Sequence, residues 1–226
     1  RLNKITLSND FNYYIVRILK NFKIDFVLDI GANNGQFAEK IKEFGFQKEI
    51  LSFEPMSEAY KKLLEKSKKY ENWQIFNKGF GQNPGKQNLN ISKNSVSSSI
   101  LNQNKYGLKF EPNSKYVAKE IIDLITLNQF LKQKKFIKKN VFIKIDTQGY
   151  EKKILAGASK VLKNIKGIML ETSIIPIYQG EKDYLDMIKF MKKKGFYVWA
   201  IEKGFSNKNT GRVIQLDIIF INKNAK

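Results

Sequence analysis

The chain has 226 residues, of which 42% are hydrophobic, enough for one sizeable domain with its own core. We expect residues 1–226 to form this single domain. The sequence contains neither cysteine nor histidine, which excludes disulfides, thiolate metal sites and catalysis by either side chain. A general base must therefore be Asp, Glu, Lys or Tyr, unless the reaction needs only a weak base.

The net charge of +20 invites a nucleic-acid partner. However, only three of the 41 basic residues are arginine, the residue whose forked guanidinium usually reads phosphates. Many of the lysines fall in pairs on predicted helix surfaces. Nucleic acid is therefore an alternative partner and not the favoured one.

No run of residues approaches the 18 apolar residues of a membrane span. The first ten residues, RLNKITLSND, contain no Met and no apolar signal-peptide core. We expect a cytoplasmic location, and we interpret the chain as part of a longer protein.

Apolar periodicity predicts alternating helices and strands over the first 80 residues. A helix over 11–22 lies within a helical lead-in that spans 1–23. The predicted elements that follow are a strand at 26–30, a helix from Asn34 to Gly45, a strand at 49–55, a helix at 57–69 and a strand at 73–80. This order predicts a parallel sheet with right-handed crossovers.

Residues 81–125 interrupt this rhythm with a segment rich in Asn, Ser, Gly and Lys. The stretches KQNLNIS and KYVAKEII are predicted as short strands around a polar loop. We expect this insertion to carry the contacts to the acceptor substrate, and a flexible surface loop is the alternative.

The α/β rhythm then resumes with a helix N-capped by Thr126. The later predictions are a strand at 140–146, a helix at 149–163, a strand at 167–172, a helix at 181–194, and two strands at 196–202 and 213–221. The last two form an antiparallel pair, because no helix-length segment separates them.

The first strand ends in a turn, VLDIGANNG, in which Gly31 and Gly35 would let a ligand approach the backbone closely. The turn lacks the middle glycine of a dinucleotide site and the Gly-Lys-[Ser/Thr] of a phosphate loop. Glu54 ends the next strand, where an acid suits a ribose diol. A ribose without a pyrophosphate indicates S-adenosylmethionine, whose cationic methionyl tail Asp29 would orient. The alternative is a tight turn beside a solvated Glu.

Five motifs together resemble the FkbM family of S-adenosylmethionine-dependent methyltransferases. They are VLDIGANNGQF, FEP, SSSIL, KIDTQGYEKKILAGA and LETSIIPIYQG, and the resemblance covers about residues 24–202. It implies an α/β, Rossmann-like class I methyltransferase fold with helices on both faces of a seven-stranded, mostly parallel sheet. The implied strand order is 3-2-1-4-5-7-6, with strand 7 antiparallel. The family typically methylates a hydroxyl, often on sugars or polyketide-type metabolites.

The resemblance also implies a cofactor site. Its residues would be Asp29, Gly31, Ala32, Asn33, Asn34, Gly35, Glu54, Pro55, Asn77, Ser98 and Ser99. Asp146 would lie near the sulfonium, the amine or the acceptor. The stretch NKGFGQ replaces the family's Ala-Leu-Gly-Asp, so contacts to adenine are not carried over to residues 78–81.

An alcohol acceptor must lose its proton during methylation. We expect Asp146 or Glu171 to be the base, with Lys144 and Tyr178 as further candidates. Asp146 and Glu171 could instead hold a divalent metal, although two acids are few ligands for it. Tyr178 is also expected in the wall of the acceptor site.

The sequence thus favours an O-methyltransferase that uses S-adenosylmethionine and acts on a small molecule or glycan, such as a sugar or polysaccharide unit or a secondary metabolite. One alternative is a ribose 2′-O-methyltransferase of RNA, motivated by the charge and by Lys78, Asp146 and Glu171. The other is a non-catalytic polyanion-binding module on a methyltransferase fold, against which the intact turn and Glu54 argue.

Overall fold

The computed structural model describes residues 10–133, 136 and 138–225. Residues 1–9 of the expected helical lead-in lie outside this range. The rest of the lead-in is helix α2 (Phe11–Asn21), and the side chain of Asp10 accepts a hydrogen bond from the Asn12 amide to cap it.

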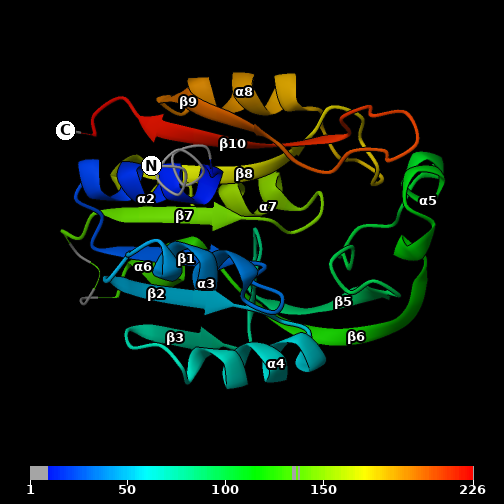
Figure 1. Ribbon diagram of the computed structural model, residues 1–226, viewed down its shortest axis with the longest axis horizontal. Coiled ribbons are helices and arrows are strands. Elements are labelled where there is room, and N and C mark those ends of the chain that lie inside the picture. The colour runs from blue at the N-terminus through cyan, green and yellow to red at the C-terminus, as the bar shows by residue number, and fades with distance from the viewer. Residues whose placement is uncertain (1–9, 134–135, 137, 226) are drawn as a thin grey trace, which may run out of the picture.

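The main sheet has seven strands in the order β3-β2-β1-β7-β8-β10-β9, which confirms the expected topology (Figure 1). The strands are β1 (Phe26–Ile30), β2 (Glu49–Phe53), β3 (Trp73–Phe76), β7 (Val141–Ile145), β8 (Gly167–Ser173), β9 (Phe196–Lys203) and β10 (Gln215–Asn222). β10 runs antiparallel to both of its neighbours, as predicted for the C-terminal pair. The central strands β1 and β7 are buried throughout, because helices cover both faces.

Two sets of three helices cover the sheet. One face packs against α2, α3 (Gln36–Glu43) and α4 (Ser57–Ser67), and the other against α6 (Leu127–Leu131), α7 (Glu151–Ala156) and α8 (Tyr184–Lys193). Side chains alternate between these two cores, so that Val27 lies in the first and Leu28 in the second.

The predicted strand at 73–80 is wrong in extent, because the chain changes sheets within it. β3 ends at Phe76, and β4 (Gly79–Phe80) belongs to a separate three-stranded sheet. Asn77 holds the crossing, since its Nδ2 donates to the carbonyl oxygens of Glu54 and Pro55. Both pieces are apolar, so the pattern looked continuous.

The segment 81–125 builds the second sheet and is not a flexible loop. β5 (Gly85–Ser92) and β6 (Tyr116–Ile125) correspond to the two predicted strands and pair antiparallel, and β4 pairs with β6. Between them lie α5 (Lys105–Phe110) and a 3₁₀ turn at Pro112–Ser114. Figure 1 places this sheet and α5 beside the carboxyl ends of β1, β2 and β7.

The helix predicted at 149–163 is shorter than expected. α7 ends at Ala156, and the carbonyl oxygen of Gly157 accepts the amide of Asn128 at 2.9 Å instead of continuing the helix. This bond ties α7 to the start of α6, where Thr126 forms the predicted N-cap within a capping box.

No helix in the described part of the chain is long and apolar enough to cross a membrane.

Candidate functional site

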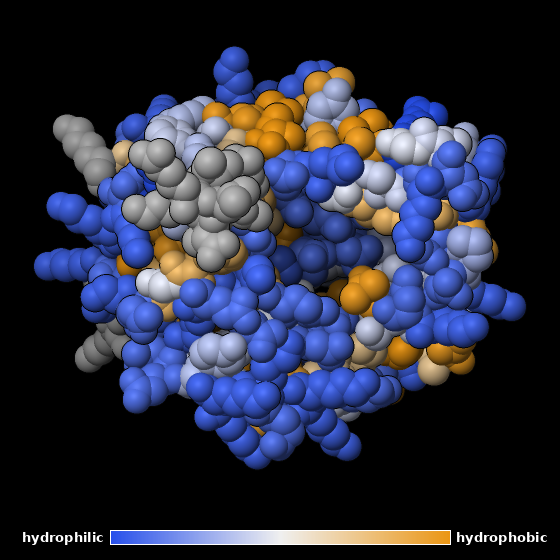
Figure 2. Space-filling model, in the orientation of Figure 1, coloured by the Kyte–Doolittle hydropathy of each residue, from blue (hydrophilic) through white to orange (hydrophobic). Residues whose placement is uncertain are grey.

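A cavity of about 550 Å³ opens at the carboxyl ends of the parallel strands. Figure 2 shows a hollow there, ringed mainly by hydrophilic residues. The walls come from the ends of β1, β2 and β7, from α2 and α3, and from the second sheet. This is the position at which open α/β sheets bind their ligands.

The turn after β1 forms the floor of the cavity and requires glycine. Gly31 has a φ of +75°, and a Cβ there would lie 1.9 Å from the backbone oxygen of Asp146. The amides of Gly31 and Ala32 both donate to the carbonyl oxygen of Phe53, which fastens the turn to the end of β2. At Gly35 a Cβ would lie within 2.9 Å of the Leu63 and Trp73 side chains.

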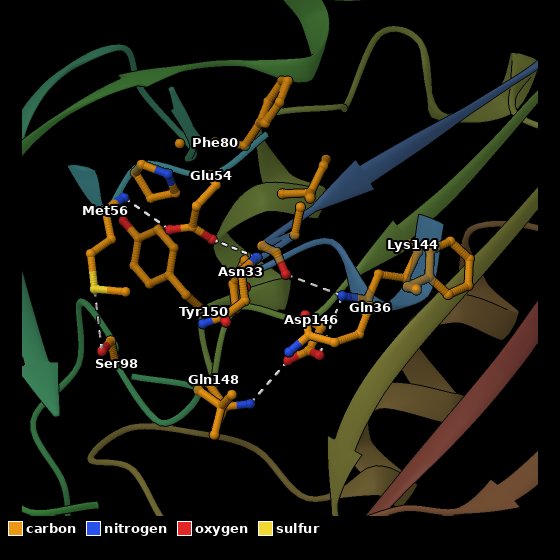
Figure 3. A pocket seen from close by; sticks show the side chains of 18 of the residues that line it. Asn33, Gln36, Glu54, Met56, Phe80, Ser98, Lys144, Asp146, Gln148 and Tyr150 are labelled. Carbon is orange, nitrogen blue, oxygen red and sulfur yellow. Dashed lines mark hydrogen bonds and ion pairs between the residues drawn. The ribbon is translucent and has the colours of Figure 1, made fainter. Parts of the chain in front are cut away.

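Glu54 is the buried acid at the end of β2. Its Oε2 accepts the amide of Asn33 at 2.7 Å, and its Oε1 accepts the amide of Met56 at 2.9 Å (Figure 3). Each oxygen keeps a second lone pair for a hydroxyl donor. Burial raises the pKa of Glu54 to about 7, against the opposing effect of these two amides.

Beside Glu54, the cavity has apolar and aromatic walls. Tyr150 projects into it close to Met56, and Phe80 lines the same end (Figure 3). Ile122 and Leu124 of β6 complete this wall. A flat, apolar group such as a purine fits between such side chains. This wall was not predicted from the sequence.

Asp29 lies beneath the turn and does not line the cavity. Its Oδ2 accepts the hydroxyl of Ser52 at 3.0 Å, and its Oδ1 lies 3.5 Å from the Nζ of Lys144. The same Nζ lies 3.3 Å from Asp146 and donates to the Gly31 carbonyl oxygen at 3.2 Å. Burial raises the pKa of Asp29.

Lys144 is thus a buried cation between two carboxylates. Burial lowers its pKa, but Asp146 and Asp29 raise it more, so the net pKa lies above the ordinary value. Lys144 therefore stays protonated at neutral pH and cannot accept a proton.

A smaller cavity of about 200 Å³ adjoins the first, and the two share Val96, Asp146 and Gln148. Glu171 and Tyr178 line the smaller cavity only. Burial raises the pKa of Glu171 well above its ordinary value, and the neighbouring carboxylates of Asp146 and Asp217 raise it further. Burial also raises the pKa of Tyr178 far above the ordinary value.

The structure brings together most, but not all, of the residues expected at the site. Six of the expected cofactor residues line the large cavity: Gly31, Ala32, Asn33, Glu54, Pro55 and Ser98. The other five lie outside its lining: Asp29, Asn34, Gly35, Asn77 and Ser99. Ser99 instead donates to the carbonyl oxygen of Gln148 at 2.7 Å.

Of the four expected catalytic residues, Asp146 lines both cavities and Lys144 the large one. Among the described residues, no group of three or more acids is arranged to hold a metal ion.

Several solved structures with a similar fold are methyltransferases. Magnesium protoporphyrin IX methyltransferase (ChlM) from Synechocystis PCC 6803, solved with bound SAM, aligns with a TM-score of 0.52 at 9% identity over 97% of this chain and 79% of its own. The methyltransferase domain of bacterial CtHen1-C aligns at 0.51 and 10% identity over 96% and 98%. TrmK from M. capricolum, solved with S-adenosyl-homocysteine, aligns at 0.50 and 11% identity over 95% and 69%. No curated protein matches the sequence.

The strand order is that of the class I methyltransferase fold. Residues 29–198 match the FkbM methyltransferase domain, and the chain belongs to that family.

Proposed function

We propose that this protein transfers a methyl group from S-adenosylmethionine to a hydroxyl of an uncharged acceptor, such as a sugar unit of a glycan or a secondary metabolite. The observation that carries the proposal is the meeting of two cavities at Asp146 and Gln148, with a second acid, Glu171, in the smaller one. Methyl transfer needs two ligands that touch at one point, and this junction is that point.

The large cavity suits the methyl donor. Glu54 would hold the ribose hydroxyls, the wall of Met56, Phe80 and Tyr150 would hold the adenine, and Asp146 would face the positive charge. S-adenosylmethionine supplies a methyl group on a positively charged sulfur, whose C–S bond breaks toward sulfur as the new O–C bond forms.

The small cavity suits the acceptor hydroxyl. Its volume lies below the usual range of about 300–1,000 Å³ for small-molecule pockets, so only one small unit of an acceptor would enter. Ile177 and Phe205 add apolar surface to the cavity that also contains Glu171, a combination that suits a sugar ring.

Glu171 is the base in this proposal. Two side-chain amides, from Gln148 and Gln215, donate to its Oε2 at 2.6 and 2.8 Å, which leaves Oε1 for the acceptor. Its raised pKa makes it a stronger base than an ordinary carboxylate. Tyr178 is a poorer candidate, because its hydroxyl already donates to Gln148 at 2.8 Å.

The charge at the junction favours a neutral acceptor over RNA. A ribose 2′-hydroxyl lies next to a phosphate, which would be repelled by Asp146, Glu171 and Asp217. Lys78, the lysine that motivated the RNA alternative, is paired with Asp123 at 2.9 Å on the surface and lines neither cavity.

The test combines calorimetry with a methyl-transfer assay on a panel of neutral glycans, acidic glycans and structured RNA. We expect S-adenosylhomocysteine to bind, methylated product to appear only with neutral hydroxyl acceptors, and Glu171→Gln to abolish turnover while leaving that binding unchanged. Methylation of RNA alone, or full turnover by Glu171→Gln, would overturn the proposal.

A further inference from the structure

Gln148 occupies the junction of the two cavities and was not among the residues expected at the site. It lies in the turn after β7 with a φ of +56°, an uncommon backbone conformation for a residue other than glycine. The Ser99 hydroxyl donates to its carbonyl oxygen and holds the turn from the side of the second sheet. A backbone held in this way fixes where the side chain begins.

The Gln148 side chain links three groups. Its Nε2 lies 2.9 Å from Asp146 Oδ1 and 2.6 Å from Glu171 Oε2, so one amide nitrogen donates to both carboxylates (Figure 3 shows the bond to Asp146). Its Oε1 accepts the hydroxyl of Tyr178 at 2.8 Å. The two carboxylates fix the amide with its nitrogen toward them, because a flipped amide would place an oxygen against both, and the Tyr178 hydroxyl holds the amide oxygen in place.

The two acids joined by Gln148 are not equivalent. Asp146 has the ammonium of Lys144 as a counter-ion at 3.3 Å. Glu171 has two amide donors on Oε2 and, among the described residues, no cation within ion-pair distance, and burial together with the neighbouring acids Asp146, Asp217 and Glu151 raises its pKa. A pair of acids whose surroundings differ in this way can divide two roles between them.

We propose that Gln148 is a positioning residue that couples Asp146 to Glu171: it aligns both carboxylates at the junction, so that Asp146 keeps its charge facing the donor cavity while Glu171 takes up the proton of the acceptor. In that step the acceptor O–H bond breaks, its electron pair stays on oxygen, and the proton bonds to Glu171. That the proton comes from an acceptor hydroxyl rests on the proposed function. The coupling of Asp146 to Glu171 does not.

The coupling can be measured without knowing the acceptor. S-adenosylmethionine and S-adenosylhomocysteine differ at the sulfur by a methyl group and a positive charge. The ratio of their affinities, measured by calorimetry from pH 5.5 to 8.5, therefore reports the negative charge at the junction. We expect the wild-type preference for S-adenosylmethionine to rise with pH as Glu171 ionises. Burial and the charge of Asp146 raise the pKa of Asp217 to about 6, and Asp217, Glu202 and Lys144 are present in every variant compared.

Gln148→Leu removes the donor shared by the two carboxylates and disfavours their charged forms. We expect the preference for S-adenosylmethionine to fall about tenfold at pH 7. The midpoint of its rise with pH should move up by about one pH unit. The matched control is Gln215→Leu, which removes a donor to Glu171 Oε2 but none to Asp146, and we expect a clearly smaller change.

The proposal is overturned if Gln148→Leu weakens both ligands by the same factor, which a merely structural role would do, or if it matches Gln215→Leu. Should Gln148→Leu fail to fold, Tyr178→Phe frees the amide to rotate, and we expect a shift of about threefold in the same direction. No shift in that variant overturns the proposal too. If the affinity ratios change as expected but no acceptor is methylated, the proposed function is contradicted and the coupling of the two acids still holds.

Discussion

The two cavities differ in how the chain builds them. The large one rests on the ends of neighbouring parallel strands, where the Gly31 turn, Glu54 and Asp146 follow β1, β2 and β7 directly. The small one is assembled from distant parts of the chain, with residues 94–114 packed against the end of β8, Tyr178 and the 205–215 region.

This difference indicates that the donor side is set by the sheet itself, whereas the acceptor side depends on the segment between β5 and β6 and on the loops after β8 and β9. Loops carried by a fixed sheet can change an acceptor without disturbing the donor. Substitutions on either side test whether the two cavities are built and used independently.

The largest effect is expected from Gly31→Ala. The new methyl group would collide with the backbone of Asp146, so we expect a loss of more than about 3 kcal/mol in the free energy of unfolding and no measurable binding of S-adenosylhomocysteine. Gly180→Ala is the control, since Gly180 has nearly the same φ, +77°, with no atom within 4 Å of an added Cβ. It should cost about 1 kcal/mol. Equal losses in urea unfolding would show that backbone strain alone, and not contact with Asp146, requires glycine.

The next effect concerns the ions beneath the donor cavity. Lys144→Met leaves the buried Asp29 without its counter-charge, and we expect it to cost about 3 kcal/mol of stability. Asp29→Asn should cost less, because Lys144 keeps Asp146 at 3.3 Å as a partner. The double variant should cost at least about 1 kcal/mol less than the sum of the two. Strict additivity in urea unfolding would mean that the pair at 3.5 Å is not coupled.

The pH dependence of binding tests Glu54. Its ionised form accepts hydroxyl donors best, so the affinity for S-adenosylhomocysteine should rise as pH passes about 7. Stability should change in the opposite sense. The folded-state pKa of Glu54 lies above its unfolded value of 4.5, so its contribution is present at low pH and is lost as pH rises through about 7. Glu54→Gln should flatten the affinity profile, and an unchanged profile would exclude Glu54 as its source.

The smallest effects are expected when one aromatic side chain in the wall of each cavity is replaced by leucine. Tyr150→Leu should weaken S-adenosylhomocysteine about tenfold, because aromatic stacking on a base contributes about 1–3 kcal/mol. Phe205→Leu, in the small cavity, should leave that affinity within about twofold while reducing turnover. Similar losses of affinity in both variants would show that the cavities do not divide the two ligands.

The sheet could be predicted from the sequence because buried parallel strands are short apolar runs that end in polar residues or glycine. The chain's change of sheet at Asn77 could not be predicted, since Phe76 and Phe80 are both apolar and the amide that holds the crossing contacts residues 22 and 23 positions earlier. The early end of α7 likewise depends on a bond between residues 128 and 157.

The residues of the candidate site likewise fall into those with a local signal in the sequence and those placed by distant contacts. Gly31, Glu54 and Asp146 carried their signal within a few residues, as turns or acids at strand ends. Gln148 and Tyr150 carried none, because their places depend on contacts with Glu171, Tyr178 and the second sheet. Asp29 was expected at the ligand, and its burial beneath the turn results from Ser52 and Lys144 on the two strands that flank β1.

The burial of Lys144 has a practical consequence for a chain so rich in lysine. Reagents that methylate or acetylate amines act on the free base at the surface, and Lys144 is only 7% exposed and is held as a cation between Asp29 and Asp146. Its reaction would require the ammonium to leave both carboxylates and lose its proton. The modification rate of this one lysine, followed by mass spectrometry, therefore measures how often its contacts with Asp29 and Asp146 break.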